Sequence, residues 1–290
     1  MSNLGLLVNL RADAKQETGR FAWVTFWLGV GTLLVIITAT ALALSGVMPL
    51  WLAGMINLAA FVAGYTVGHE IIHDSLIGRH THLSWLNVFF GTLFFSVPFH
   101  SLTMHRYIHL RHHSHTNDPE KDPDAWISGR NSFALLLRLL THYPHYQYHV
   151  IKWTRDMPAR AAFLTRCLLE QTVPMAIAAV LILSGYGAEV FWMWILPSFL
   201  VYPVLAFILD WAPHHDLEVG TPLDNSRLLG TPQGVRGQLF TWLYLFQNYH
   251  LIHHLYPKVP FYRYKSLYER HSEELIAAGA AIYPGFDQKS

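Results

Sequence analysis

The sequence predicts an all-α integral membrane protein with four transmembrane helices in two hairpins. Of its 290 residues, 52% are hydrophobic and only 13% are charged. Four stretches reach the roughly 20 apolar residues that a helix needs to cross a bilayer. The connectors within the two pairs are short, SGV and GYGA. No polar or Gly/Ser-rich linker divides the chain, so we expect residues 1–290 to form a single domain.

The elements follow in order along the chain. Residues 1–20 are mixed and polar, carry no evident cleavable signal peptide, and form an expected N-terminal segment outside the bilayer. The first helix pair is expected within residues 21–68 and the second within residues 161–209. Residues 69–160 should form interfacial helices, and residues 210–290 a helical cap outside the bilayer.

The apolar stretch 83–104 is ambiguous because it contains several polar side chains and a proline. With four spans, all twenty Lys and Arg residues lie on the side of the N-terminus or at its membrane edge. The positive-inside rule then places both termini and the long middle segment, with the histidine clusters described below, on the cytoplasmic side. A fifth span would put the histidine clusters described below on opposite faces, about 30 Å apart. We therefore expect 83–104 to return as a re-entrant or interfacial pair of helices.

Three clusters of histidine have helical spacing, HEIIH, HLRHH and HLIHH. Their members are His69, His73, His109, His112, His113, His250, His253 and His254. Residues at i, i+3 and i+4 share one helix face, so the rings of each cluster converge. Neutral imidazole is a common ligand of iron, zinc and copper. Eight rings exceed the need of one four-coordinate ion, which predicts a two-metal site.

The topology brings these clusters to one membrane depth. The first closes the second span, the second follows the returning segment, and the third opens the C-terminal region. Asp210 and His214 follow the end of the fourth span at the same membrane depth.

Histidines outside the clusters are expected at the membrane interface, where an apolar ring meets water. These are His80, His82, His100, His142, His145, His149 and His271. In the HYPHYQYH segment, Pro144 is expected to interrupt the helix.

The sequence leaves two other classes of function open and argues against several more. HEIIH also matches the zinc-protease pattern, with Glu70 as general base. A bis-histidine haem protein or a metal transporter is a third hypothesis, although both fit poorly with histidines at the ends of the spans. The net charge of +1 gives no sign of nucleic-acid binding. The single cysteine, Cys167, excludes an intramolecular disulfide and a thiolate metal site.

Four segments carry a resemblance to a known family: HEIIH, HLRHHSHTNDPEKDPD, LDWAPHH and QNYHLIHHLYPKVPFYRY. They resemble the membrane fatty-acid desaturase superfamily over residues 66–264. Within it they are most similar to the cyanobacterial and plastid-type β-carotene hydroxylases. One departure is Glu70, where those hydroxylases more often carry aspartate.

The resemblance implies a non-haem di-iron centre that uses dioxygen and a ferredoxin-type electron donor to hydroxylate a β-ionone ring. It implies His214 as a ninth ligand beside the eight clustered histidines. The same superfamily also contains carotenoid ketolases and fatty-acyl desaturases and hydroxylases, so these activities remain alternatives. No catalytic residue beyond the metal centre is implied.

Polar side chains near the clusters could orient the ligands. Ligating histidines usually donate their other N–H to a carboxylate or a carbonyl. The candidates are Asp118, Asp122 and Asp124 after the second cluster, together with Glu70, Asp74, Asp210 and Asn248. The alternative for the NDPEKDPD segment is a turn that is capped by aspartate and has no metal role.

The substrate and the electron donor must come from outside the chain. Zinc has no redox chemistry, whereas two irons could attack a C–H bond of a lipophilic substrate that enters from the bilayer. Aromatic residues of the spans are expected to line a slot for this substrate: Trp51, Phe61, Tyr65, Phe94, Phe95, Phe207 and Trp211.

The chain has no cysteine-ligated cluster and no dinucleotide-binding fingerprint, so the electron donor is expected to be a separate protein. A basic face could dock it or bind anionic lipid: Arg106, Arg111, Lys121, Arg263 and Lys265.

Overall fold

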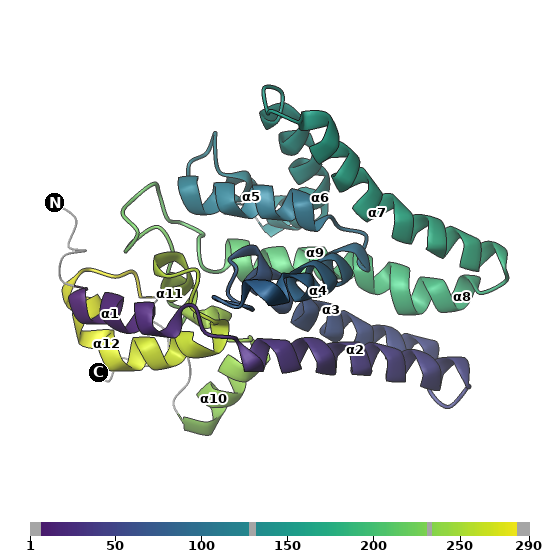
Figure 1. Cartoon of the computed structure of the whole chain (residues 1–290), viewed down its shortest axis with the longest axis horizontal. Coiled ribbons are helices and arrows are strands. Elements are labelled where there is room, and N and C mark those ends of the chain that lie inside the picture. The colour runs from purple at the N-terminus through teal and green to yellow at the C-terminus, as the bar shows by residue number, and fades with distance from the viewer. Residues whose placement is uncertain (1–6, 128–131, 231–233, 283–290) are drawn as a thin grey trace.

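The computed structural model describes residues 7–127, 132–230 and 234–282, and these form helices without a named strand. Four helical segments are long and apolar enough to cross a membrane, which confirms the predicted spans. They are α2 (Trp23–Leu44), α3 (Leu50–Ile72), α7 (Arg160–Leu183) and a continuous segment Gly187–Trp211. Figure 1 shows the two hairpins extending toward the same end of the molecule, away from both chain termini.

The fourth span combines α8 (Gly187–Val190) and α9 (Leu196–Leu205) with two wider π-helical turns. A π turn leaves a backbone carbonyl without its usual helical partner. At the first of these turns, Asn57 Nδ2 on α3 donates to the carbonyl oxygen of Met193 at 2.8 Å. The two hairpins are therefore joined by a buried hydrogen bond between two of the predicted membrane spans.

The ambiguous segment does not form a fifth span, as expected. Helix α4 (Ser84–Ser96) has 13 residues, which gives a length of about 20 Å and is too short for a 30 Å hydrocarbon core. Phe99 has a positive φ of 62°, and the chain then turns back into α5 (Leu102–His115). Both ends of this helix pair therefore lie on one side.

Helix α4 packs closely against α3 because α3 has glycine at the contact points. Phe94 lies over Gly64 and Phe95 over Gly68, where an added Cβ would meet the aromatic ring. Phe94 and Phe95 are buried, so they fill the core rather than line an open slot. Trp51 and Phe207 are not enclosed in a slot either, since 52% and 42% of their surfaces are exposed.

Helix α6 (Ser132–Trp153) continues through Pro144, so the prediction that this proline interrupts the helix is wrong. Proline costs a helix one hydrogen bond. Here, packing of α6 against α5 and α9 compensates for that loss. Phe133, Leu136 and Leu137 remain exposed on the outer side of the helix, as expected for a helix at the membrane interface.

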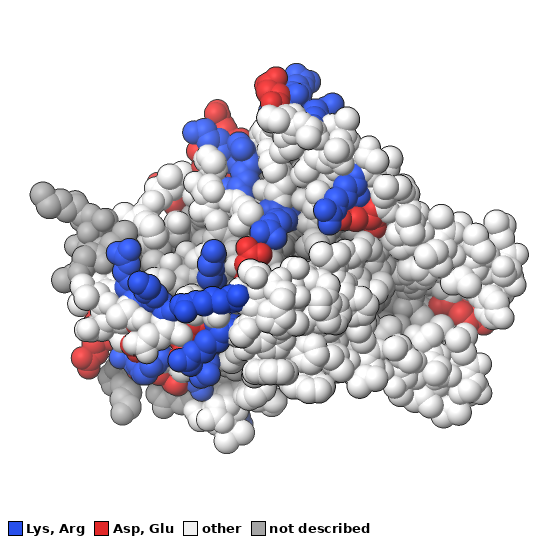
Figure 2. Space-filling model, viewed as in Figure 1, with Lys and Arg blue, Asp and Glu red and all other residues white. Residues whose placement is uncertain are grey.

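The remaining helices cap the end of the spans that carries the histidines. They are α1 (Val8–Glu17), α10 (Gly234–Leu243), α11 (His250–Leu255) and α12 (Tyr264–Ala277). Helices α1 and α12 lie side by side, and Asp13 binds Arg270 across them at 3.0 Å. In Figure 2, Lys and Arg gather over this end and over the flank above it, while the far ends of the hairpins carry none in this view.

Candidate metal centre

Four imidazoles from three helical regions form a first group. His69 lies on α3, His73 caps its end, His109 lies on α5 and His253 on α11, and one nitrogen from each lies within 4.8 Å of the others. His109 Nε2 is 2.9 Å from His69 Nε2 and 2.8 Å from His73 Nε2. All four side chains are buried, so the group is shielded from water.

A second group of four lies beside the first. It contains His112 of α5, His214 just after the fourth span, and His250 and His254 of α11, again with one nitrogen from each within 4.8 Å of the others. His254 Nε2 is 3.3 Å from His112 Nε2 and 3.1 Å from His250 Nε2. His214 Nε2 is buried and, within the described part of the chain, has no hydrogen-bond partner.

His113 lies between the two groups. Its Nε2 is 3.1 Å from His109 Nε2 and 2.9 Å from His253 Nε2, both in the first group. Its ring stacks on His254 of the second group at a centroid distance of 4.4 Å. The structure therefore brings all nine predicted histidines into one continuous cluster.

Local geometry explains how the three helices α3, α5 and α11 present these rings. The four-residue spacing on α3 and the i, i+3, i+4 spacing on α5 place the rings of each cluster on one face. Before α11, Leu245 and Phe246 both have positive φ, which ends α10 and redirects the chain. Leu229 N then donates to Asn248 O at 2.8 Å and holds the redirected segment in place.

The arrangement fits metal ions better than it fits hydrogen bonds between imidazoles. A neutral imidazole has one donor and one acceptor nitrogen, so a pair of rings can share only one proton. His109 Nε2 faces three other Nε2 atoms at 2.8 to 3.1 Å, and no single proton on it satisfies all three contacts. Two nitrogens bound to one ion at about 2.1 Å lie about 3.0–3.4 Å apart. The observed separations are close to that range.

The protonation states of most rings also suit metal binding. Burial lowers the pKa of His109, His113 and His253 well below the usual value, and neighbouring histidines lower it further. Burial, followed by the charge of His112, lowers the pKa of His214 to about 3. Metal binding requires neutral imidazole, and these rings are held in that form.

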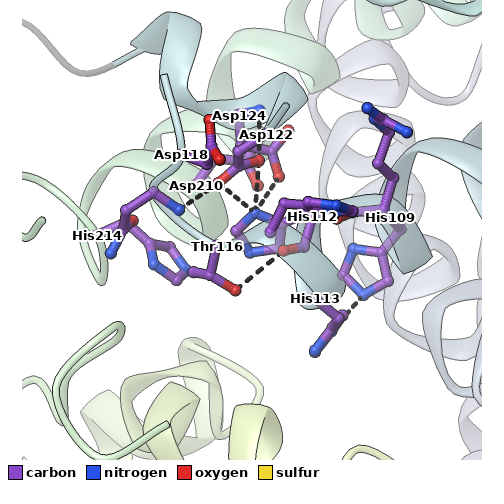
Figure 3. Close-up of polar contacts among 12 residues, drawn as sticks. His109, His112, His113, Thr116, Asp118, Asp122, Asp124, Asp210 and His214 are labelled. Carbon is purple, nitrogen blue, oxygen red and sulfur yellow. Dashed lines mark hydrogen bonds and ion pairs between the residues drawn. The ribbon is translucent and has the colours of Figure 1, made fainter. Parts of the chain in front are cut away.

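His112 differs from the other rings because two carboxylates lie against it (Figure 3). Its Nδ1 is 2.9 Å from Asp122 Oδ1 and 3.1 Å from Asp124 Oδ2. Burial alone would lower the pKa of His112, but the two carboxylates outweigh it and raise the pKa to about 9. This geometry fixes a proton on Nδ1 and leaves Nε2 directed at the second group. Asp122 and Asp124 are thus placed where the sequence suggested.

Asp210 lies at the edge of the second group. Its Oδ2 is 3.8 Å from His142 Nε2, and His142 Nε2 is also 3.8 Å from Asp124 Oδ1. A small cavity is lined by Asp210 together with His112 and His214. Asp210 therefore faces a buried acidic and imidazole environment, although no hydrogen bond joins it to His214 within the described residues.

Two contacts to the clustered histidines were not predicted from the sequence. His214 Nδ1 donates to the backbone carbonyl of Asn225 at 3.0 Å. His253 Nδ1 is 3.0 Å from the hydroxyl of Tyr264. A backbone carbonyl leaves no signal in the sequence, whereas Tyr264 belongs to the PKVPFYRY segment that follows the third cluster.

Glu70 faces away from the imidazoles. Its Oε1 accepts from Phe261 N at 3.1 Å and its Oε2 accepts from Thr25 Oγ1 at 3.4 Å. The carboxylate therefore ties α3 to α2 and to the segment before α12. This placement argues against the zinc-protease hypothesis, in which Glu70 must reach a metal-bound water beside His69 and His73.

The other polar candidates also have partners outside the histidine groups. Asp74 forms an exposed ion pair with Arg106 at 3.3 Å. Asp118 Oδ1 accepts a hydrogen bond from Glu120 N at 2.9 Å. Asp118 therefore caps a turn, which is the alternative role considered for this segment. Asn248 Nδ2 donates to Thr241 Oγ1 at 3.2 Å.

Three histidines expected at the membrane interface are buried instead, and for them that prediction is wrong. His100 Nε2 is 3.0 Å from His105 Nδ1, and His105 Nε2 is 2.9 Å from Tyr65 OH. The other two, His142 and His271, are also buried, the latter 3.0 Å from Asp13. In the folded chain each of these rings has a polar group within 3.8 Å, and a search for helical spacing does not detect such long-range neighbours.

Comparison with known proteins adds an independent finding. A family model described as fatty acid desaturase matches residues 43–286, which include all nine clustered histidines. A comparison with curated proteins found no match. The matched region extends from the end of the first span to the C-terminal cap and so covers most of the chain.

Proposed function

The chain belongs to the fatty acid desaturase family, and on that premise we propose that it is a di-iron oxygenase that hydroxylates the β-ionone ring of a carotenoid. The family and the four spans establish an integral membrane oxidoreductase with a lipophilic substrate. The observation that carries the proposal is the convergence of nine imidazoles, seven of them buried, with eight in two adjoining groups of four and His113 between the groups.

Each group would hold one iron. We assign the first iron to His69, His73, His109 and His253, and the second to His112, His214, His250 and His254. His113 would complete the ligand set from its position between them. When bound, two irons supply an oxidant, formed from dioxygen and donated electrons, that can take hydrogen from an unactivated C–H bond.

The protein's own contribution is to orient the rings and exclude water. The carboxylates of Asp122 and Asp124 hold a proton on His112 Nδ1, and the carbonyl of Asn225 holds one on His214 Nδ1. The hydroxyl of Tyr264 lies 3.0 Å from His253 Nδ1 and orients that ring. Because these partners fix each ring, the Nε2 atoms remain directed into the two groups.

The choice of a carotenoid rests on the third histidine cluster and the HLYPKVPFYRY segment around it. The alternative is a fatty-acyl desaturase or hydroxylase, which the description of the matching family favours. A carotenoid ketolase on the same scaffold is a further alternative. All three start with removal of hydrogen from a C–H bond, so the substrate rather than the metal centre distinguishes them.

We propose that the histidine end faces the cytoplasm and receives electrons from a separate ferredoxin-type protein. The distribution of Lys and Arg supports this orientation, because they gather at that end (Figure 2). Arg111 donates to Lys121 O at 2.9 Å and stacks on Trp153 at 4.1 Å. With Arg106 nearby on α5, these residues could present a basic face to an acidic donor.

Expression in a host that accumulates β-carotene tests the substrate. The proposal predicts new hydroxylated carotenoids in the pigment extract and none in cells that express His253→Ala. Unchanged pigments with altered membrane acyl chains would favour the acyl alternative. New keto carotenoids would favour the ketolase. Intact lipids with cleaved membrane proteins would contradict all three oxidative activities.

A further inference from the structure

A cluster of two carboxylates and one imidazole lies beside the second histidine group, outside both sets of iron ligands. Asp124, His142 and Asp210 each contribute one atom, and these atoms lie within 4.8 Å of one another. The residues come from elements that pack together, namely the short 3₁₀ helix Pro123–Ile127, α6 and the last turn of the fourth span. Figure 3 shows Asp124 and Asp210 on the same side of His112. We call this cluster the Asp–His–Asp site.

The imidazole of His142 has a nitrogen without a hydrogen-bond partner. His142 is only 5% exposed, and its Nε2 is buried and forms no hydrogen bond within the described part of the chain. This nitrogen lies 3.8 Å from Asp124 Oδ1 and 3.8 Å from Asp210 Oδ2. A hydrogen bond needs about 2.7–3.2 Å. His142 Nε2 is therefore directed between two carboxylates that are too far away to bond to it, and a buried nitrogen without a partner is costly.

The separations in the Asp–His–Asp site fit a metal ion better than a bridging water molecule. Donors that lie about 2.1–2.2 Å from one ion, at angles of roughly 110–120°, are about 3.4–3.8 Å apart. Two groups that share one water at about 2.8 Å each, at a tetrahedral angle, are about 4.6 Å apart. The distance of 3.8 Å from His142 Nε2 to each carboxylate oxygen lies within the first range and well below the second.

The surroundings of the site are acidic. Asp122 and Asp124 lie against His112, and Asp124 Oδ1 also accepts a hydrogen bond from Tyr146 OH. Among the described residues, no Lys or Arg forms an ion pair with Asp122, Asp124 or Asp210. Buried carboxylates are costly unless a cation compensates their charge. Because His112 is already assigned to the second iron, a further cation fits the charge of this region.

Two small cavities adjoin the site and give an ion room for water ligands. One, of about 60 Å³, is lined by Asp124 and Asp210 and also by the exposed Pro119. The other, of about 30 Å³, is lined by His142 and Asp210. A water molecule needs about 10–15 Å³, so both cavities can hold one. Since Pro119 lies at the surface, the first cavity leads from the surface toward the carboxylates.

We propose that Asp124 Oδ1, Asp210 Oδ2 and His142 Nε2 bind a third, exchangeable divalent cation, with water as its remaining ligands. Two carboxylates and one imidazole without a thiolate suit a first-row ion such as Mn²⁺. The site has three protein donors, whereas each iron is assigned four, so its ion should exchange more readily than the irons. This proposal goes beyond the proposed function, since it involves neither the substrate nor the iron ligands.

Titration of the iron-loaded full chain with Mn²⁺ tests this proposal. The protein is kept in lipid nanodiscs, washed briefly with a chelator and assayed for iron. The electron paramagnetic resonance signal of free Mn²⁺ then gives the amount bound. The wild type should bind about one Mn²⁺ per chain without losing iron. His142→Ala and Asp210→Ala should each weaken this binding by about tenfold or more, because each removes one of the protein donors.

His145→Ala is the matched control. His145 lies on the same helix as His142, and its ring stacks on Trp126 at a centroid distance of 4.5 Å, outside the site. This variant should bind Mn²⁺ as the wild type does. Full iron content in His142→Ala would show that the fold and the histidine groups are intact. If that variant does not fold, Asp210→Ala, at the partly exposed edge of the site, gives the same comparison.

The proposal would be overturned by any of several results. The wild type could bind no Mn²⁺, or it could bind Mn²⁺ no more tightly than His142→Ala and Asp210→Ala do. Loss of one iron for each Mn²⁺ bound would place the ion in the histidine groups instead. Failure of the di-iron proposal gives a different result, since the purified wild type would then lack the two irons. Even then, the wild type should bind one Mn²⁺ more than His142→Ala.

Discussion

The two histidine groups are close neighbours but differ in what surrounds them. In the second group, two carboxylates lie against His112, and Asp210 lies nearby. In the first group, His253 has a neutral hydroxyl as its partner, while His69 Nδ1, like His250 Nδ1 of the second group, is buried with no partner among the described residues. Negative charge near a metal site stabilises the bound cation and makes the ligand more basic. The comparison suggests two metals with unequal affinity and unequal electronic character.

Removal of one ligand from either group should have the largest effect. We expect His253→Ala and His112→Ala each to lower activity by about 10³-fold or more, because the ligands act as one unit. Iron content should fall in both, measured by elemental analysis of purified protein. His80→Ala, which changes an exposed histidine outside the groups, serves as the control. Full activity of either ligand variant would show that its group is not required.

Replacing a carboxylate beside His112 with a neutral amide should weaken metal binding in the second group but not in the first. Asp122→Asn removes part of the charge that raises the pKa of His112, and a loss of about 10- to 100-fold in metal affinity or activity is expected. The loss should be confined to one iron, so that titration with a chelator gives two distinct phases. Asp118→Asn alters a turn cap and should behave like the wild type. Equal weakening of both irons would contradict the asymmetry.

Loss of the neutral hydroxyl partner of His253 in the first group should lower activity less than loss of a carboxylate in the second group. Tyr264→Phe removes the 3.0 Å contact to His253 Nδ1. A net hydrogen bond contributes about 1 kcal/mol, so kcat/KM should fall by about fivefold while the iron content stays near two. Tyr148→Phe, at an exposed site, is the matched control. If Tyr264→Phe were as damaging as Asp122→Asn, the two groups would not differ as proposed.

The smallest effect on activity is expected at Glu70, although this residue lies between two ligands in HEIIH. Glu70→Ala leaves the buried Phe261 N–H without its acceptor and should lower the free energy of unfolding by about 1–3 kcal/mol. Activity and iron content at low temperature should stay near the wild-type values. Glu70→Gln keeps an acceptor oxygen and should recover most of the stability, as seen in thermal unfolding. Complete loss of activity in Glu70→Gln would revive the general-base hypothesis.

The sequence predicted those features that depend on local spacing. The four spans follow from apolar length, and the return of α4 and α5 follows from the need to bring His69 and His109 together. The contacts to Asn225 and Tyr264 were not predicted, because they depend on how distant segments pack. Glu70, adjacent in sequence to His69, points elsewhere because successive helix residues are turned about 100° apart.

The expected aromatic slot illustrates the same limit. Apolar residues in a span can face lipid, fill the core or line a cavity, and hydrophobicity alone does not distinguish these fates. Phe95 packs over Gly68 and Trp51 is exposed, whereas Phe61, Tyr65 and Trp211 each line a different cavity. The polar Asn57, which the sequence did not single out, became informative only when its partner Met193 was known.

The metal content of the purified, active protein tests the central claim most directly. Elemental analysis combined with Mössbauer spectroscopy of iron-57-labelled protein counts the metals and reports whether their environments differ. The proposed function predicts about two irons per chain in two distinguishable sites, with no activity when zinc replaces them. A single metal per chain, with zinc supporting full activity, would contradict the account.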